Sequence, residues 1–335
     1  QLWLVQYQTG SYRDALTQFE TILSDHQSSN VAAGALLWKA ESQYRLQRYQ
    51  EAYSTYSSFI NQYPGSARID EAYYGQGYAA LKLNRNNDAA RAFGQAAQQT
   101  GSTNLQADAY LRRGDAFFNS RSFNQAIQSY EQVLNMSGNP PHQPEAQFQI
   151  GQAHYRAENF RAARSAFQKV VTEYPQSDVA DQALYLSGRS AFRADEFQTA
   201  IQDFQQLQEK YPDSEFVPDA VYTSGDAYYN LGRYQQAEAQ YRKVIQQYPD
   251  SDLVADAISG LQWSLMQRGA SERSLNQVDQ LIDNLDDPNK AAEIIAQQGE
   301  YAANAGQDSL ALNKYRRILR EYPRTTAAGN AYAAI

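Results

Sequence analysis

A repeating unit of 37 residues runs through this 335-residue chain and restricts it to a repeat architecture. Tyr-Pro dipeptides are separated by 111, 37, 37 and 74 residues, and they begin at Tyr63, Tyr174, Tyr211, Tyr248 and Tyr322. All four separations are multiples of 37, so no insertion or deletion breaks the phase. Such chains stack copies of one supersecondary unit, and we therefore expect a single solenoid over residues 1–335.

Three further positions repeat in the same phase, and each carries one kind of residue. An Ala occupies eight of nine copies: Ala15, Ala52, Ala89, Ala126, Ala163, Ala200, Ala237 and Ala311. Four residues later stands a ring, here called the core ring: Phe19, Tyr56, Phe93, Tyr130, Phe167, Phe204, Tyr241 and Tyr315. A third position, here called the repeat glycine, holds Gly77, Gly114, Gly151, Gly188, Gly225 and Gly299. Small residues let two helices approach closely and a ring fills the gap one turn away, so the pattern predicts helix packing.

Each copy contains two segments with apolar residues at helical spacing. Between Gly225 and Tyr248 the sequence reads GDAYYNLGRYQQAEAQYRKVIQQY, with Gly232 at the turn between the segments. Pro249 then ends the second segment. The sequence therefore predicts an all-α fold, a solenoid of about nine helix-turn-helix units.

The unit resembles a tetratricopeptide repeat, whose consensus residues would be Gly225, Tyr228, Ala237, Tyr241 and Pro249. Three residues beyond the usual length of about 34 follow the proline. This longer form, with YPDS, YPQS or YPGS, is similar to repeats of bacterial extracytoplasmic proteins. Examples are the Tol-Pal-associated periplasmic coordinator of cell constriction and the lipoprotein of the outer-membrane barrel-assembly machinery. The resemblance implies a right-handed superhelix with the first helix of each pair on the inner wall.

Two stretches depart from the pattern. In the degenerate repeat 248–284, Ser274 replaces the Ala and Val278 replaces the core ring, so this copy is expected to be a softer joint. Three prolines in NPPHQP replace the usual inter-repeat turn, and proline stiffens or redirects the chain. A further joint is therefore expected near residues 137–144.

Composition excludes several classes of function. A net charge of −8 repels a phosphate backbone, so nucleic acid is not an expected partner. No apolar run is long enough to cross a bilayer. The three histidines, His26, His142 and His154, lack metal-ligand spacing, and the glycines form no phosphate-binding loop. We therefore expect no metal, no cofactor and no catalytic activity.

The chain contains no Cys, which favours an oxidising compartment such as the bacterial periplasm and leaves a cytoplasmic location open. Its first residues, QLWLVQYQTG, lack the features of a targeting segment. Any such segment, and any association with the outer membrane, is expected to depend on parts outside this sequence.

Rings recur at two positions of the first helix, three residues before the repeat glycine and four residues after it. In tetratricopeptide arrays these positions face the inner groove, and two arginines lie beside them. The predicted partner-binding residues are Tyr74, Phe118, Phe148, Tyr155, Tyr185, Phe192, Tyr222, Tyr229, Arg156 and Arg193.

The pattern favours a non-catalytic scaffold that binds a peptide or partner protein, in the assembly or maintenance of a bacterial cell envelope. Rings supply contact area at low entropic cost, and Tyr adds a hydroxyl donor. Two alternatives stay open: a glycan-binding scaffold of polysaccharide export, and the effector-sensing arm of a cytoplasmic regulator.

Overall fold

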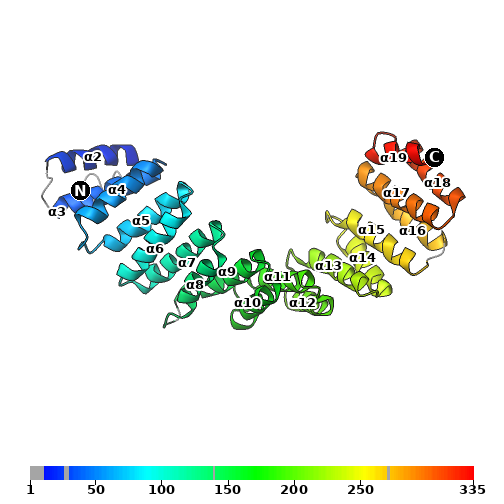
Figure 1. The fold of residues 1–335 in the computed structure, drawn as a ribbon, viewed down its shortest axis with the longest axis horizontal. Helices are drawn as coiled ribbons and strands as arrows, with labels where there is room; N and C mark the ends of the chain where they lie inside the picture. Colours follow the sequence, from blue (N-terminus) through cyan, green and yellow to red (C-terminus); the bar gives the residue numbers. More distant parts are fainter. Residues whose placement is uncertain (1–10, 26–29, 139, 270–271) are drawn as a thin grey trace. The chain divides into compact units, whose positions relative to one another are not determined.

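The computed structural model describes residues 11–25, 30–138, 140–269 and 272–335. Regular structure in these residues is entirely α-helical, so the predicted all-α class is confirmed (Figure 1). The helices are α2 (Tyr12–Asp25), α3 (Asn30–Arg45), α4 (Tyr49–Gln62), α5 (Ile69–Lys82), α6 (Asn86–Gln99), α7 (Thr103–Asn119), α8 (Phe123–Leu134), α9 (Gln143–Arg156), α10 (Phe160–Glu173), α11 (Ala180–Arg193), α12 (Phe197–Lys210), α13 (Val217–Asn230), α14 (Tyr234–Gln247), α15 (Val254–Gln267), α16 (Glu272–Ile282), α17 (Pro288–Asn304), α18 (Asp308–Glu321) and α19 (Thr326–Ala334).

The helices follow one another as the predicted pairs. Within the described residues, eight complete pairs run from α3–α4 to α17–α18, while α2 is a second helix and α19 a first helix. The predicted solenoid fold class is therefore confirmed, while a single solenoid over residues 1–335 stays a prediction. The chain divides into two compact units, Gln1–Ala180 and Asp181–Ile335. The stretch 137–144 lies inside the first unit, and its role as a joint stays a prediction.

The turn inside each pair is built in the same way. Its central residue has a positive φ in eight copies: Gln47, Asn84, Arg121, Glu158, Asp195, Gly232, Gly269 and Gly306. In seven of these copies the next backbone N–H donates a hydrogen bond to the first helix, as Arg233 N does to Tyr228 O at 2.9 Å. Second helices end at the residue before each Tyr-Pro, as predicted, because proline lacks the N–H that would continue them.

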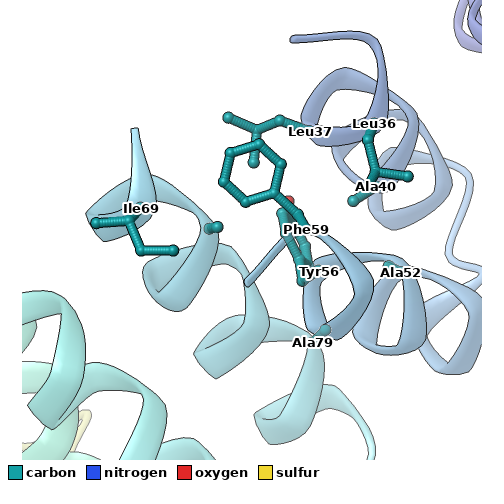
Figure 2. Close-up of a cluster of buried hydrophobic side chains, with 9 residues drawn as sticks. Leu36, Leu37, Ala40, Ala52, Tyr56, Phe59, Ile69 and Ala79 are labelled. Carbon is teal, nitrogen blue, oxygen red and sulfur yellow. The ribbon is translucent and has the colours of Figure 1, made fainter. Parts of the chain in front are cut away.

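The repeat glycine is a close-contact position. A Cβ added to Gly151 would lie 2.6 Å from the fully buried ring of Phe167, and the other five repeat glycines face their core rings in the same way. Figure 2 shows a core of the first unit that carries Ala40 at the repeat-glycine position, where Tyr56 and Phe59 of α4 lie beside Leu37 of α3 and Ile69 of α5. The six repeat glycines therefore leave room for their core rings where first and second helices meet.

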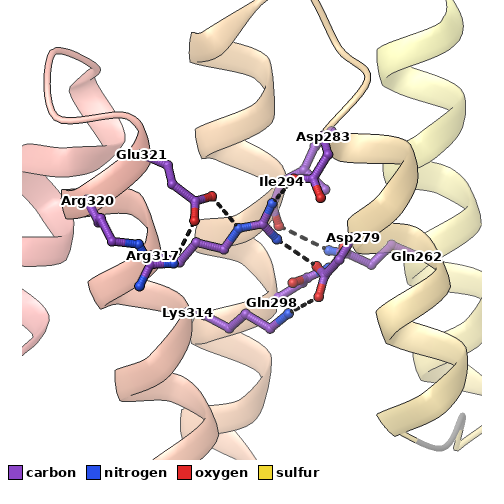
Figure 3. Close-up of polar contacts among 9 residues, drawn as sticks. All are labelled: Gln262, Asp279, Asp283, Ile294, Gln298, Lys314, Arg317, Arg320 and Glu321. Atoms are coloured by element: carbon purple, nitrogen blue, oxygen red, sulfur yellow. Dashed lines mark hydrogen bonds and ion pairs between the residues drawn. The ribbon is translucent and has the colours of Figure 1, made fainter.

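The degenerate repeat 248–284 replaces this contact with polar ones (Figure 3). Gln262 stands at the repeat-glycine position, is fully buried, and accepts a hydrogen bond of 2.7 Å from Gln298 Nε2. Asp279 of α16 forms ion pairs with two basic residues of α18, Lys314 at 2.6 Å and Arg317 at 3.2 Å. Hydrogen bonds and ion pairs thus connect this copy to the next one.

Candidate functional site

The rings that precede the repeat glycine pack onto the core ring of their own repeat. The ring-centroid distances are 5.6 Å for Tyr74–Phe93, 5.5 Å for Phe148–Phe167, 6.2 Å for Tyr185–Phe204 and 5.8 Å for Tyr222–Tyr241. Phe148 and Tyr185 are each only 6% exposed, whereas Tyr74 and Tyr222 are half-buried. This position is therefore partly core and partly surface.

The rings that follow the repeat glycine close the turn inside each pair. Each meets the first ring of the second helix edge-on, at centroid distances of 5.2 to 5.6 Å in Phe118–Phe123, Tyr155–Phe160, Phe192–Phe197 and Tyr229–Tyr234. All four rings on the first helix are half-buried, while Arg156 and Arg193 are exposed. The recurrence of rings at both positions thus has a packing explanation alongside the binding one.

Two pockets open among these side chains, one in each unit. The first has a volume of about 500 Å³ and lies between α3, α4, α5 and α7; the second, of about 520 Å³, lies between α13, α14, α15 and α17. We call them the first pocket and the second pocket. Of the predicted partner-binding residues, Tyr74 lines the first pocket, and Tyr222 and Tyr229 line the second. The other seven line neither.

The two pockets occupy equivalent places in the repeat. Nine lining positions correspond at a separation of 185 residues, which is five periods: Leu37 and Tyr222, Glu41 and Asp226, Tyr44 and Tyr229, Tyr56 and Tyr241, Glu71 and Asp256, Tyr74 and Ser259, Gly75 and Gly260, Tyr78 and Trp263, and Leu105 and Lys290. A Cβ at Gly75 or Gly260 would lie within 2.5 Å of the tyrosine ring of the preceding repeat. Glycine at this position occurs only in these two copies, a sequence signal that the periodicity search missed.

A second sequence pattern that the periodicity search missed links a tyrosine at the core-ring position to a carboxylate. Tyr56 donates a hydrogen bond to Glu41 at 2.8 Å, and Tyr241 donates one to Asp226 at 2.7 Å. In all four copies whose core ring is Tyr, the residue after the repeat-glycine position is acidic: Glu41, Asp115, Asp226 and Glu300. In the copies with Phe or Val at the core ring, it is Leu4, Tyr78, Gln152, Arg189 and Trp263. The phenol therefore accompanies its acceptor, as the burial of a hydroxyl requires.

The pockets differ in charge. In the first, Glu41 and Glu71 are paired with Arg45 at 2.9 Å and Arg68 at 2.6 Å, so the lining is neutral. The second is lined by three carboxylates and one cation, Asp226, Asp256, Glu293 and Lys290, which leaves a net charge of −2. Lys290 pairs with Asp256 at 3.0 Å. Burial raises the pKa of Asp226 to about 6. The negative charge of Asp256 adds to this increase, whereas the hydrogen bond from Tyr241 lowers the pKa.

Elsewhere the described part of the chain holds no cluster of acidic, His or Cys side chains suited to a metal ion. His142 Nδ1 lies 3.2 Å from Glu145, and burial lowers the pKa of His154. His26 lies outside the described residues. None of the described helices has the length and apolar character needed to span a bilayer.

The raised pKa of Asp226 predicts a pH-dependent cost to stability. Its folded-state pKa of about 6 exceeds the ordinary value, so ionisation disfavours the fold, and this penalty grows as the pH rises from about 4 to 6. Asn keeps an acceptor for Tyr241 and carries no charge. We expect Asp226→Asn to raise the free energy of unfolding by about 1 to 3 kcal/mol at pH 8 and by little at pH 4. Urea denaturation at both pH values measures this, and an equal effect at pH 4 and pH 8 would contradict it.

Three overlapping stretches, residues 4–107, 102–221 and 179–335, match the sequence model of the YfiO family, described as outer membrane lipoprotein. Together they cover nearly the whole chain. No curated protein matches the sequence.

Solved structures support the same fold. The C-terminal part of a tetratricopeptide-repeat-containing protein from Cytophaga hutchinsonii superposes with a TM-score of 0.58 at 19% identity, covering 78% of this chain and 98% of that one. The apo form of RapI superposes with a TM-score of 0.55 at 13% identity, covering 95% and 97%. At these identities the similarity establishes the tetratricopeptide-type solenoid and nothing finer.

Proposed function

The chain belongs to the YfiO family of outer membrane lipoproteins, and on that basis we propose that it is a non-catalytic scaffold of the bacterial cell envelope that binds an extended peptide segment of a partner protein. The observation that carries this proposal is the recurrence of one pocket, lined by rings and carboxylates, at equivalent places five repeats apart. A feature that only filled the core would close these spaces. Instead, each pocket wall contains a glycine, Gly75 or Gly260, which contributes no side chain to fill the space.

The pocket walls suit a peptide. The second pocket presents Tyr222, Tyr229 and Trp263, all half-buried, so each can lose further surface to a ligand. Tyrosine and tryptophan are enriched among the residues that dominate binding energy at protein interfaces. Carboxylates at the rim supply acceptors for backbone N–H groups or basic side chains.

We further propose that the protein works at the periplasmic side of the outer membrane, held there by parts outside this sequence. The family description and the lack of cysteine support this location. The partner is a protein or peptide, and a glycan ligand is the alternative to be tested against it.

Replacing Tyr222 and Tyr229 together by Ala is expected to weaken partner capture from envelope extract at least about tenfold, because each ring is an anchor worth about 2 kcal/mol. Tyr185 is a poorer choice for the test, since it is buried and stacks on Phe216 at 5.1 Å. Captured partners are quantified by mass spectrometry, and peptide and glycan arrays identify the ligand class.

The matched control is Tyr332→Ala, which removes a ring that is 75% exposed on α19. Circular dichroism of both variants checks that helix content is kept. Unchanged capture by a well-folded Tyr222→Ala/Tyr229→Ala variant, or binding of glycans in preference to peptides, would overturn the proposal.

A further inference from the structure

Three copies place a half-buried carboxylate against a core tyrosine, and two of them supply an arginine for it. Arg45 pairs with Glu41 at 2.9 Å, and Arg112 pairs with Asp115 at 2.7 Å. The third carboxylate is Asp226, which pairs with no cation among the described residues. A carboxylate withdrawn from water is costly unless a cation compensates it.

The second pocket lacks each arginine that the related sites contain. The residue equivalent to Arg45 is Asn230, the one equivalent to Arg112 is Thr223, and Arg68 of the first pocket corresponds to Leu253. The carboxylates have been kept, since Asp226 and Asp256 correspond to Glu41 and Glu71. The pocket thus has the acceptors of an arginine site and lacks the arginine; its one lining cation, Lys290, pairs with Asp256 at 3.0 Å and leaves Asp226 uncompensated.

The rest of the lining fits a guanidinium. In the first pocket, Arg68 already lies over the face of Trp38 at 5.0 Å, which shows how an arginine sits among these rings. The second pocket offers the rings of Tyr222, Tyr229 and Trp263. Gln297 also lines this pocket, and its Oε1 is a buried acceptor with no hydrogen-bond donor in the described residues.

We propose that the second pocket binds an arginine side chain of the partner, with the guanidinium placed between Asp226, Asp256 and the aromatic walls. This deepens the proposed function and rests on it, because the arginine belongs to the bound peptide. Arginine is favoured over lysine because its planar group stacks on rings and donates to two carboxylates at once.

The test uses Nα-acetyl-arginine N-methylamide as the probe and the citrulline analogue as its neutral match. Binding to the intact chain is followed by the NMR signal of the indole N–H of Trp263, with Trp38 of the first pocket as an internal reference. We expect the arginine probe to shift the Trp263 signal saturably and to bind about tenfold more tightly than the citrulline probe. Equal binding of the two probes, or tighter binding of the corresponding lysine compound, would overturn the assignment.

Two variants make the test specific. Asn230→Arg restores the internal arginine of the first pocket and is expected to abolish probe binding, whereas Asn119→Arg adds the same charge at the equivalent position of the first unit and should change nothing. Asp226→Asn is expected to weaken the probe about tenfold while Tyr241 keeps an acceptor. Full binding by either pocket variant contradicts the proposal. Loss of partner capture on removal of Tyr222 and Tyr229, without any response to arginine, would leave the scaffold function standing and reject only this inference.

Discussion

Replacing Asp279 by Ala is expected to lower the free energy of unfolding of the second unit by about 3 kcal/mol. Asp279 is the ion-pair partner of Lys314, which is only 8% exposed, and it also pairs with Arg317 (Figure 3). Arg317 retains Asp283 and Glu321 after the substitution, but Lys314 would be left as a buried charge without a partner. Urea denaturation measures the loss, followed by tryptophan fluorescence in a Trp3→Phe/Trp38→Phe background where Trp263 is the single tryptophan.

The double variant Asp279→Leu/Lys314→Met separates the charge from the packing. Apolar residues of similar volume can replace a buried ion pair at little cost, so the double variant should recover most of the stability that Asp279→Ala loses. If Asp279→Ala unfolds like the parent protein, the network contributes nothing. In that case the ion pairs to α18 would not stabilise repeat 248–284, which is predicted to be a softer joint.

Replacing Gly151 by Ala is expected to destabilise the first unit by about 1 to 3 kcal/mol. Alanine ordinarily stabilises a helix relative to glycine by about 1 kcal/mol. Here the new Cβ would lie 2.6 Å from the ring of Phe167, which is fully buried, so the ring or the helix would have to shift. The steric cost therefore exceeds the gain in helix propensity.

Gly34→Ala is the matched control, because no atom lies within 4 Å of a Cβ built at this position in α3. It is expected to leave stability unchanged or to raise it slightly. Adding Phe167→Leu to Gly151→Ala should recover part of the loss by making room for the new methyl group. Thermal denaturation of the four proteins gives the comparison, and a Gly151→Ala variant as stable as Gly34→Ala would contradict the close-contact role of the repeat glycine.

Much of the fold could be predicted from sequence because the same physical requirement is repeated in every copy. The repeat glycine, the Ala and the core ring occur together in six copies, and the structure confirms the Gly151–Phe167 contact that this pattern implies. The Tyr-Pro dipeptide after five of the second helices likewise predicts where those helices end.

The pockets could not be found in this way, because they depend on what differs between copies. Gly75 and Gly260 lie two residues before the repeat-glycine position, where the other copies carry larger side chains. The ring at Tyr185 has the same spacing as the ring at Tyr222, yet Phe216 stacks on Tyr185, while Tyr222 lines a pocket. Spacing along one helix does not reveal which neighbouring side chain covers a ring.

The polar contacts also indicate which segments of the chain can be duplicated or deleted as separate units. The bonds from Tyr56 to Glu41 and from Tyr241 to Asp226 span 15 residues and stay inside one repeat, so duplication or deletion of such a repeat carries donor and acceptor together. The bonds from Lys314 to Asp279 and from Gln298 to Gln262 span 35 and 36 residues and join two consecutive repeats. A recombination event between those two repeats would leave a buried lysine and two buried amides without these partners, so we expect the last two complete repeats to be retained together as one segment of about 74 residues.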